Sequence, residues 1–217
     1  MKKNSKLILS LSSLTIFLIT LILVTVKTPS IDNWISQNIK FLWGPFNGFF
    51  IFLGNYSRDI MILLALIFAG FLYLRKRKKE SVTLILGLSI GYILEEIIKI
   101  LIQRTRPAMQ LVTETDYSFP SGHSIFSIIL FSLIIYFYKD EIKNKTLKIL
   151  FIIANILVII LIGFSRIYLN VHWFTDVVGG YAIGFFVANL LLFILKESDA
   201  KNNHREHRKN NYFGQKI

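Results

Sequence analysis

Cysteine is absent from this 217-residue chain, which excludes disulfides and thiolate metal sites. Acidic residues are also few, with 13 Asp and Glu against 25 Lys and Arg, so the formal net charge is +12. Such a charge can indicate nucleic-acid binding, but the basic residues here lie in gaps between long apolar runs. Loops that face the cytoplasm and anionic lipid have this pattern, so the sequence predicts a membrane as partner and no nucleic acid.

Hydrophobic residues, by contrast, make up 53% of the chain, and the mean hydropathy is +0.55. They form continuous runs rich in Ile and Leu, which favour helices over the alternating strands of a membrane barrel. The sequence therefore predicts an all-α, polytopic membrane domain over residues 1–196. Its six expected transmembrane helices are about Leu7–Val26, Ser57–Leu74, Val82–Ile102, Ser121–Tyr138, Leu147–Phe164 and Val171–Leu195.

Both ends of the chain allow two interpretations. The first run has a basic flank like that of a signal peptide, but it is about twenty residues long and ends without a small-x-small cleavage site. We therefore expect an uncleaved first helix. Residues 197–217 are polar and lack periodicity, which predicts a basic, disordered cytoplasmic tail. His204 and His207 lie there, and a solvated pair is favoured over a metal site.

The distribution of basic residues predicts the orientation. The N-terminus, the stretches 75–80 and 139–148, and the C-terminus from Lys196 hold three, five, four and six Lys or Arg residues, which is eighteen of the 25. With six spans all four segments fall on one side, and the positive-inside rule makes that side cytoplasmic. Both termini are then cytoplasmic, and the regions 27–57, 103–120 and 165–171 lie on the outer face of a cell membrane. Trp34 and Trp43 in the first of these regions suit an outer interface.

Three polar clusters fall at the outer ends of the expected spans: KILIQRTRP (99–107), PSGH (120–123) and SRIYLNVHWFTD (165–176). They contribute the cations Lys99, Arg106 and Arg166. Guanidinium groups match phosphate oxygens in pairs, and an ammonium adds a point charge. The three cations therefore indicate a site for a phosphate group.

The PSGH stretch reads as the start of a helix. Ser121 is expected to cap it, and Gly122 would let backbone N–H groups approach a ligand closely. His123 then lies in the first turn, directed at the same place. A helix N-terminus of this kind is suited to anions.

His172 and Asp176 are four residues apart, which would stack them on one face of a helix. The carboxylate can then accept a hydrogen bond from one ring nitrogen and leave the other as a nucleophile or base. No cluster of carboxylates or His typical of a metal site accompanies them. The pattern favours phosphoryl transfer without a metal.

Together these clusters resemble the three-part signature of the type-2 phosphatidic acid phosphatase family, the lipid phosphate phosphatases that share a core with vanadium haloperoxidases. K-x6-R-P at 99–107, P-S-G-H at 120–123 and S-R-x5-H-x3-D at 165–176 match without a substitution. The layout is most similar to small bacterial members that act on phosphatidylglycerophosphate and undecaprenyl pyrophosphate.

The resemblance implies a role for each residue. His172 would attack phosphorus and form a phosphohistidine, while Asp176 orients it and stabilises its positive charge. His123 would protonate the leaving oxygen and then activate water. The family needs no metal, so no cofactor is expected. The phosphoryl oxygens would be held by Lys99, Arg106, Ser121, the Gly122 amide and Arg166.

Other polar residues have weaker assignments. Glu95 and Glu96 can each pair with Lys99 on a helix, and we expect them to position it or to neutralise the site. Tyr168 and Asn170 are possible lining residues. The remaining expectations concern helix packing by Gly179, Gly180 and Gly184, and shaping of headgroup access by Asp116, Tyr117 and Phe119.

Two alternatives remain open from the sequence. A membrane phosphotransferase would pass the phosphoryl group to an alcohol instead of water, and a transporter would use the intramembrane charges for ions or anions. A haloperoxidase is disfavoured because those relatives are soluble. Phosphatidylglycerophosphate, undecaprenyl pyrophosphate, phosphatidic acid and diacylglycerol pyrophosphate all remain candidate substrates, and the oligomeric state is undetermined.

Overall fold

The structure is a computed structural model that describes residues 3–214, with side chains described for residues 8–197. Residues 3–214 form helices and connecting loops without a β-strand, so the all-α prediction is confirmed for this part of the chain. The elements are α1 (Lys3–Val26), α2 (Ser30–Asn38), the 3-10 helix η1 (Ile39–Leu42), α3 (Asn47–Leu74), α4 (Lys78–Ile102), α5 (Gly122–Tyr138), α6 (Lys145–Tyr168) and α7 (Phe174–Gly214).

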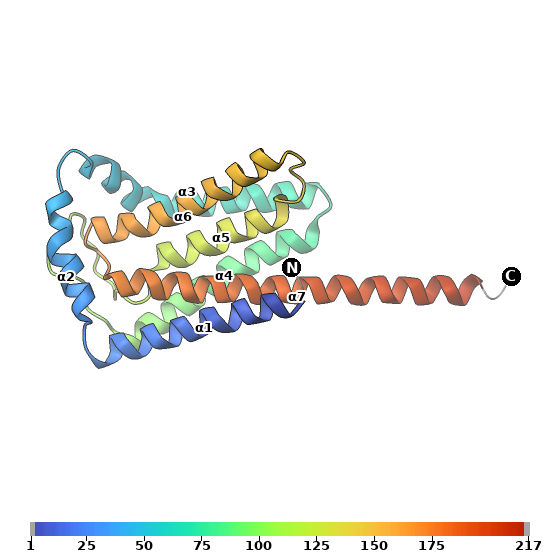
Figure 1. The fold of residues 1–217 in the computed structure, drawn as a ribbon, viewed down its shortest axis with the longest axis horizontal. Coiled ribbons are helices and arrows are strands. Elements are labelled where there is room, and N and C mark those ends of the chain that lie inside the picture. Colours follow the sequence, from blue (N-terminus) through green and yellow to red (C-terminus); the bar gives the residue numbers. More distant parts are fainter. Residues whose placement is uncertain (1–2, 215–217) are drawn as a thin grey trace.

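The long helices lie side by side, and the short helix α2 crosses one end of the bundle (Figure 1). Helix α5 is apolar on every face and packs against α3, α4, α6 and α7, which makes it the centre of the bundle. Helix α1 packs chiefly on α7. The central core includes Leu72, Leu84, Ile125, Ile129, Leu130, Leu133 and Ala188.

Close packing of α7 against the bundle depends on its glycines. A Cβ atom at Gly180 would lie 2.6 Å from the backbone oxygen of Ser121, and one at Gly184 would lie 2.9 Å from that of Ile125. A Cβ atom at Gly179 would meet the Phe119 ring at 2.6 Å. The prediction that these glycines permit close helix packing is confirmed.

The outward faces of the bundle are apolar, as lipid requires. Leu63, Leu66, Ile100 and Leu157 are each more than half exposed. Within the part of the chain that the structure describes, four helices are long and apolar enough to cross a membrane, namely Ile8–Val26, Asn47–Leu74, Lys145–Tyr168 and Phe174–Glu197. Helix α5 is apolar but has only 17 residues, and α4 carries Glu95, Glu96 and Lys99 near its end. The chain is therefore a multi-helix membrane protein.

Two helix starts differ from the sequence prediction. Helix α3 begins at Asn47, ten residues before the expected Ser57, because the Phe-rich stretch that precedes Ser57 contains no proline and continues the helix. Helix α7 begins at Phe174 rather than Val171. The chain turns at Asn170, whose φ is +54°, and the amides of Val171 and His172 both donate to the Arg166 carbonyl at the end of α6.

Helix α7 continues without a break to Gly214, so the described part of the expected tail is helical, while the disorder and cytoplasmic location expected for residues 197–217 stay predictions. The tail contains neither proline nor glycine between Gly184 and Gly214 and is rich in Lys, Glu and Arg, which favour helix. The side chains of His204 and His207 lie outside the described residues.

Figure 1 also shows how the basic segments are arranged. The start of α1, the α3–α4 turn, the α5–α6 loop and the extension of α7 all lie at one end of the bundle, and α2 lies at the other. The bundle therefore has one strongly basic end, and the 103–121 loop and the 169–173 turn are at the opposite end.

Candidate phosphate site

The three sequence motifs meet at the end of the bundle where α2 lies. Lys99 is in the last turn of α4, His123 in the first turn of α5, and Arg166 in the last turn of α6. His172 follows in the turn before α7, and Asp176 is in the first turn of that helix. All five side chains belong to buried residues, with Asp176 0% and Arg166 1% exposed. Segments far apart in sequence thus build one charged, enclosed cluster.

The imidazole of His172 is held by a backbone carbonyl. Its Nδ1 lies 2.8 Å from the Ser118 oxygen, and this acceptor places the ring proton on Nδ1. Nε2 then carries the lone pair and accepts a hydrogen bond from the Arg106 guanidinium at 3.2 Å. Of the two ring nitrogens, Nε2 is therefore the one that can act as a base or nucleophile. The sequence does not reveal the Ser118 carbonyl as a partner of His172, because every residue type carries a backbone carbonyl.

Asp176 does not share a helical face with His172 as predicted, because His172 precedes α7. Its Oδ2 nevertheless lies 3.4 Å from Nδ1 of His172 and accepts a 2.9 Å hydrogen bond from the Trp173 amide. Its Oδ1 is paired with the Arg104 guanidinium. The carboxylate thus stands behind His172 as an electrostatic partner, at a longer distance than the Ser118 carbonyl.

The three predicted phosphate-binding cations are paired with carboxylates of the 103–121 loop. Asp116 lies 2.5 Å from Nζ of Lys99 and 2.5 Å from Nη2 of Arg106. Glu114 pairs with Nη2 of Arg166 at 2.5 Å. Burial alone would raise the pKa of Asp116, but hydrogen bonds and charge from Lys99 and Arg106 outweigh it and lower that pKa to about 2. The carboxylate oxygens of Asp116 and Glu114 thus contact the same cations that are predicted to bind phosphate oxygens.

Glu95 forms the floor of the cluster. Its side chain is fully buried and pairs with Lys99 at 2.7 Å and with Arg58 of α3 at 3.1 Å. Of the two carboxylates expected near Lys99, Glu95 makes the contact, while Glu96 forms no ion pair within the described residues. Arg58 is a fourth cation that the motifs did not reveal, because it lies in a different helix far from them in sequence.

The start of α5 packs tightly on Glu95. A Cβ atom at Gly122 would lie 2.1 Å from Oε1 of Glu95, so any larger residue would displace the Glu95 carboxylate. Ser121 occupies the N-cap position, but its side chain makes no capping hydrogen bond. Its Oγ instead accepts from the Ser124 hydroxyl at 3.1 Å. The capping role predicted for Ser121 is therefore wrong in this structure, because the neighbouring hydroxyl engages that oxygen.

Three buried nitrogens in and beside the cluster lack a hydrogen-bond partner within the described residues. They are Nε2 of His123, Nε of Arg166 and Nε of Arg104, whose guanidinium pairs with Asp176. Buried polar atoms are nearly always paired, so unpaired ones mark places where a ligand can bind. His123 also lies within electrostatic range of Arg166, His172 and Lys99.

The remaining candidates hold the loops in place. Asn170 donates to the Met109 carbonyl at 2.6 Å, and the Tyr168 hydroxyl donates to the Leu42 carbonyl at 2.9 Å. Phe119 is fully buried and stacks on Phe17 of α1 at 6.0 Å. Tyr117 is exposed, as are several other residues of its loop. Tyr168, Asn170 and Phe119 thus act as supports of the cluster in this structure.

The electrostatics of the cluster favour a neutral His172. Burial lowers the pKa of His172 well below its usual 6.5, and the charges of Arg106, Arg166 and Lys99 lower it further. At neutral pH the ring is therefore uncharged and Nε2 can attack an electrophile. Within the described residues, no group of three His, Asp or Glu side chains is arranged to hold a metal ion.

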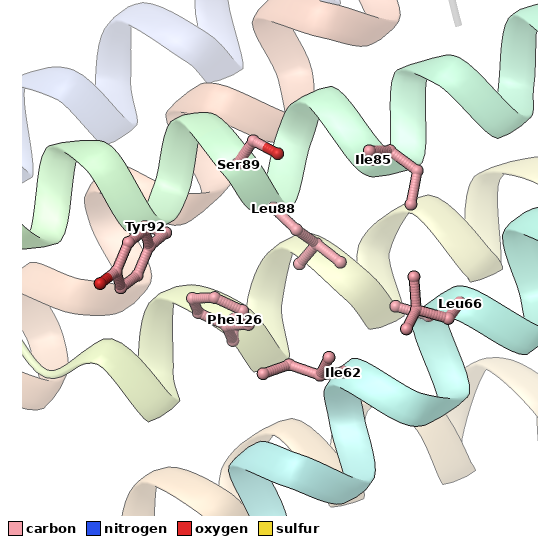
Figure 2. A pocket seen from close by; sticks show the side chains of 8 residues that line it. Ile62, Leu66, Ile85, Leu88, Ser89, Tyr92 and Phe126 are labelled. Atoms are coloured by element: carbon pink, nitrogen blue, oxygen red, sulfur yellow. The ribbon is translucent and has the colours of Figure 1, made fainter.

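An apolar groove lies between α3, α4 and α5, beside the charged cluster (Figure 2). Tyr92 and Phe126 bound it on one side, and the Arg58 guanidinium lies 5.6 Å and 5.0 Å from their ring centroids. Arg58 thus connects the groove to Glu95 and Lys99. The residues that line it are Ile62, Ala65, Leu66, Ile85, Leu88, Ser89, Tyr92 and Phe126.

Comparison with known proteins identifies the class. The PAP2 superfamily model matches residues 80–199, which is more than half of the chain and includes all three motifs. The chain therefore belongs to the PAP2 superfamily, and the resemblance seen in the sequence is confirmed.

Individual relatives agree with this assignment. Phosphatidylglycerophosphatase B of Bacillus subtilis is 35% identical over 148 residues, covering 67% of this chain and 70% of that protein. An undecaprenyl-diphosphatase of Sulfolobus acidocaldarius is 29% identical over 151 residues, covering 66% and 68%.

Among solved structures, the chain is similar to the crystal structure of the first transmembrane PAP2 type phosphatidylglycerolphosphate phosphatase from Bacillus subtilis. The TM-score is 0.74 at 26% identity, covering 87% of this chain and 96% of that chain. The relatives are named as phosphatases, which are hydrolases acting on lipid phosphates.

Proposed function

We propose that this protein is an integral membrane phosphatase that removes a terminal phosphate from a lipid phosphate or pyrophosphate through a phosphohistidine. The observation that carries the proposal is the arrangement around Nε2 of His172. This nitrogen is unprotonated, is held by the Ser118 carbonyl through Nδ1, and lies 3.2 Å from an Arg106 nitrogen. A nucleophile beside a phosphate-binding cation is what phosphoryl transfer requires.

In the first step Nε2 of His172 attacks phosphorus, a P–N bond forms, and the bond from phosphorus to the lipid oxygen breaks. Lys99, Arg106 and Arg166 exchange their loop carboxylates for the phosphoryl oxygens and stabilise their charge. The Gly122 amide and Ser121, both at the start of α5, donate further hydrogen bonds to these phosphoryl oxygens. Asp176 balances the positive charge that develops on His172.

His123 completes the cycle as acid and base. As an imidazolium with a proton on each ring nitrogen, it gives the Nε2 proton to the leaving lipid oxygen and becomes neutral. It then takes a proton from water, which attacks the phosphohistidine, breaks the P–N bond and releases phosphate. The buried, unpaired Nε2 of His123 supports this role.

The membrane arrangement belongs to the same proposal. Six helices span the bilayer, the basic end of the bundle faces the cytoplasm, and the phosphate site opens on the outer face. The substrate headgroup reaches the cations while its hydrocarbon chain lies in the apolar groove beside Arg58. A groove in this position suits a lipid substrate, because it faces the bilayer and joins the charged cluster through Arg58.

The decisive experiment measures phosphate release from purified protein on four lipids: phosphatidylglycerophosphate, undecaprenyl pyrophosphate, phosphatidic acid and diacylglycerol pyrophosphate. Replacing His172 by Ala is expected to abolish release, since it removes the proposed nucleophile, while Leu63→Ala on the lipid-facing side of α3 serves as the control. Full activity in the His172→Ala protein would refute the mechanism.

Two further readouts of the same assay separate the alternatives. Activity is expected to persist in EDTA, and a loss that only added metal restores would contradict the metal-free mechanism. Counting free phosphate against phosphate transferred to an added alcohol distinguishes a hydrolase from a phosphotransferase. A transporter would release no phosphate from any of the four lipids.

A further inference from the structure

Behind the candidate nucleophile lies a buried charge network that none of the phosphate-binding roles uses. Its centre is Arg104, which is only 7% exposed although it belongs to the loop that follows α4. Nη2 of Arg104 lies 2.7 Å from Oδ2 of Asp32, and Nη1 is paired with Oδ1 of Asp176. The guanidinium is therefore engaged by two carboxylates and does not join the three cations that face the loop carboxylates.

Asp32 comes from α2, the short helix that crosses the end of the bundle (Figure 1). It is 1% exposed, and both of its oxygens are used. Oδ1 accepts from the Thr175 amide at 2.9 Å, while Oδ2 accepts from the Thr175 hydroxyl at 2.6 Å and from Arg104. Asp32 thus caps the start of α7 from a distant part of the chain.

The Asp176 carboxylate is consequently held on both oxygens. Arg104 holds one oxygen, and the Trp173 amide holds the other, which faces Nδ1 of His172. The Arg104 guanidinium also stacks over the Trp173 ring at 5.4 Å. A buried carboxylate without such partners would rotate or take up a proton, and either change would withdraw its support from His172.

We propose that Arg104 and Asp32 are positioning residues that hold the Asp176 carboxylate ionised and aligned behind His172, so that helix α2 is part of the catalytic apparatus. The inference rests on the function proposed above. The network has a net negative charge, because it contains two carboxylates and one guanidinium. This charge offsets the positive charge that forms on His172 as it attacks phosphorus. Removing the charge of Asp32 leaves the network neutral and weakens this compensation.

The test compares Asp32→Asn and Arg104→Gln with the unchanged protein on the best lipid substrate. We expect kcat to fall roughly ten- to hundredfold, the range typical of residues that orient a catalytic group. KM and the inhibition constant of orthovanadate are expected to stay within about twofold, because the phosphate-binding cations are untouched. Asp59→Asn, an exposed aspartate of α3, is the matched control and should keep full activity.

A double-variant cycle distinguishes positioning from general loss of structure. In an Asp176→Asn background, adding Asp32→Asn is expected to lower kcat little further, since the carboxylate it supports is already gone. Additive losses, or a rise in KM and in the vanadate constant with unchanged kcat, would overturn the proposal. If Asp32→Asn does not fold, Thr175→Val keeps the backbone and volume and should still lower kcat at constant KM; unchanged kcat there would also overturn it.

The proposal and the underlying function fail in different ways. If the unchanged protein releases no phosphate from any lipid, the proposed phosphatase function fails. If it is active, depends on His172, and retains full kcat in the folded Asp32→Asn and Arg104→Gln variants, only the positioning role fails.

Discussion

At the scale of single residues, the site depends on a buried histidine that stays uncharged among cations. The Ser118 carbonyl determines which nitrogen of His172 carries the proton, and burial with three nearby positive charges keeps the second proton away. The phosphate-binding cations are meanwhile balanced by carboxylates, of which Asp116 is ionised at any physiological pH. A substrate phosphate therefore competes with ready-made anionic partners, which favours strongly charged headgroups.

The depressed pKa of His172 has a measurable effect on stability. In the unfolded chain His172 takes up a proton near its usual pKa of 6.5, whereas in the folded protein it does so only at much lower pH. Its contribution to the free energy of unfolding is thus present above pH 6.5 and is lost as pH falls. Relative to His172→Gln, the unchanged protein should lose up to about 1.4 kcal/mol per pH unit below 6.5.

Thermal unfolding in detergent between pH 7.5 and 5.5 measures this difference. Comparing the two proteins cancels the contributions of the other titrating groups. Parallel pH dependence of both proteins would show that His172 is not held neutral.

At the scale of the helices, the meeting of α7 with the start of α5 aligns the second and third motifs. Gly180 lets α7 pass against the Ser121 backbone, since a Cβ atom there would lie 2.6 Å from that carbonyl oxygen. Gly180→Ala is therefore expected to destabilise the protein by about 1–3 kcal/mol and to reduce phosphate release, because backbone cannot move aside as a side chain can.

Gly70→Ala in α3 is the matched control, since nothing lies within 4 Å of its added Cβ atom. That change should be neutral or stabilising by up to about 1 kcal/mol. Equal melting temperatures and activities for the two alanine variants would contradict the packing role of Gly180.

The groove between α3, α4 and α5 makes a second prediction at this scale. Leu66→Trp fills the groove and should raise KM for a long-chain lipid phosphate about tenfold, which equals about 1.4 kcal/mol of lost binding. Hydrolysis of a short, water-soluble phosphate ester should be unchanged, because only the hydrocarbon chain is displaced. Leu63→Trp, on the same helix but outside the groove, is the control. Equal effects on both substrates would exclude the groove as the chain-binding site.

At the scale of the whole molecule, the basic segments lie at one end of the bundle, and α2 and the candidate phosphate site lie at the other (Figure 1). Because the chain has no cysteine, single cysteines report orientation without background. Gln37→Cys in α2 should react with an impermeant maleimide on intact cells, and Lys143→Cys in the α5–α6 loop only after permeabilisation. Both residues are exposed. The reverse labelling pattern would place the site on the cytoplasmic face.

The membrane class, the all-helical fold and the family follow from the sequence alone, because hydropathy, charge distribution and motif spacing are properties of short stretches of chain that do not depend on how the chain folds. The predicted order and direction of the helices also placed the three motifs at one end of the bundle. Helix starts were less certain, as α3 and α7 show, because a few polar or turn residues set them.

The groups that support the motif residues become apparent only in the folded protein. Ser118 acts through its backbone, while Glu114, Arg58 and Asp32 reach the cluster from segments distant in sequence. No local sequence pattern indicates such partners, because the need for them arises only when the fold buries a charged group. A charge enclosed at the membrane edge must find an opposite charge or a hydrogen bond wherever the fold provides one.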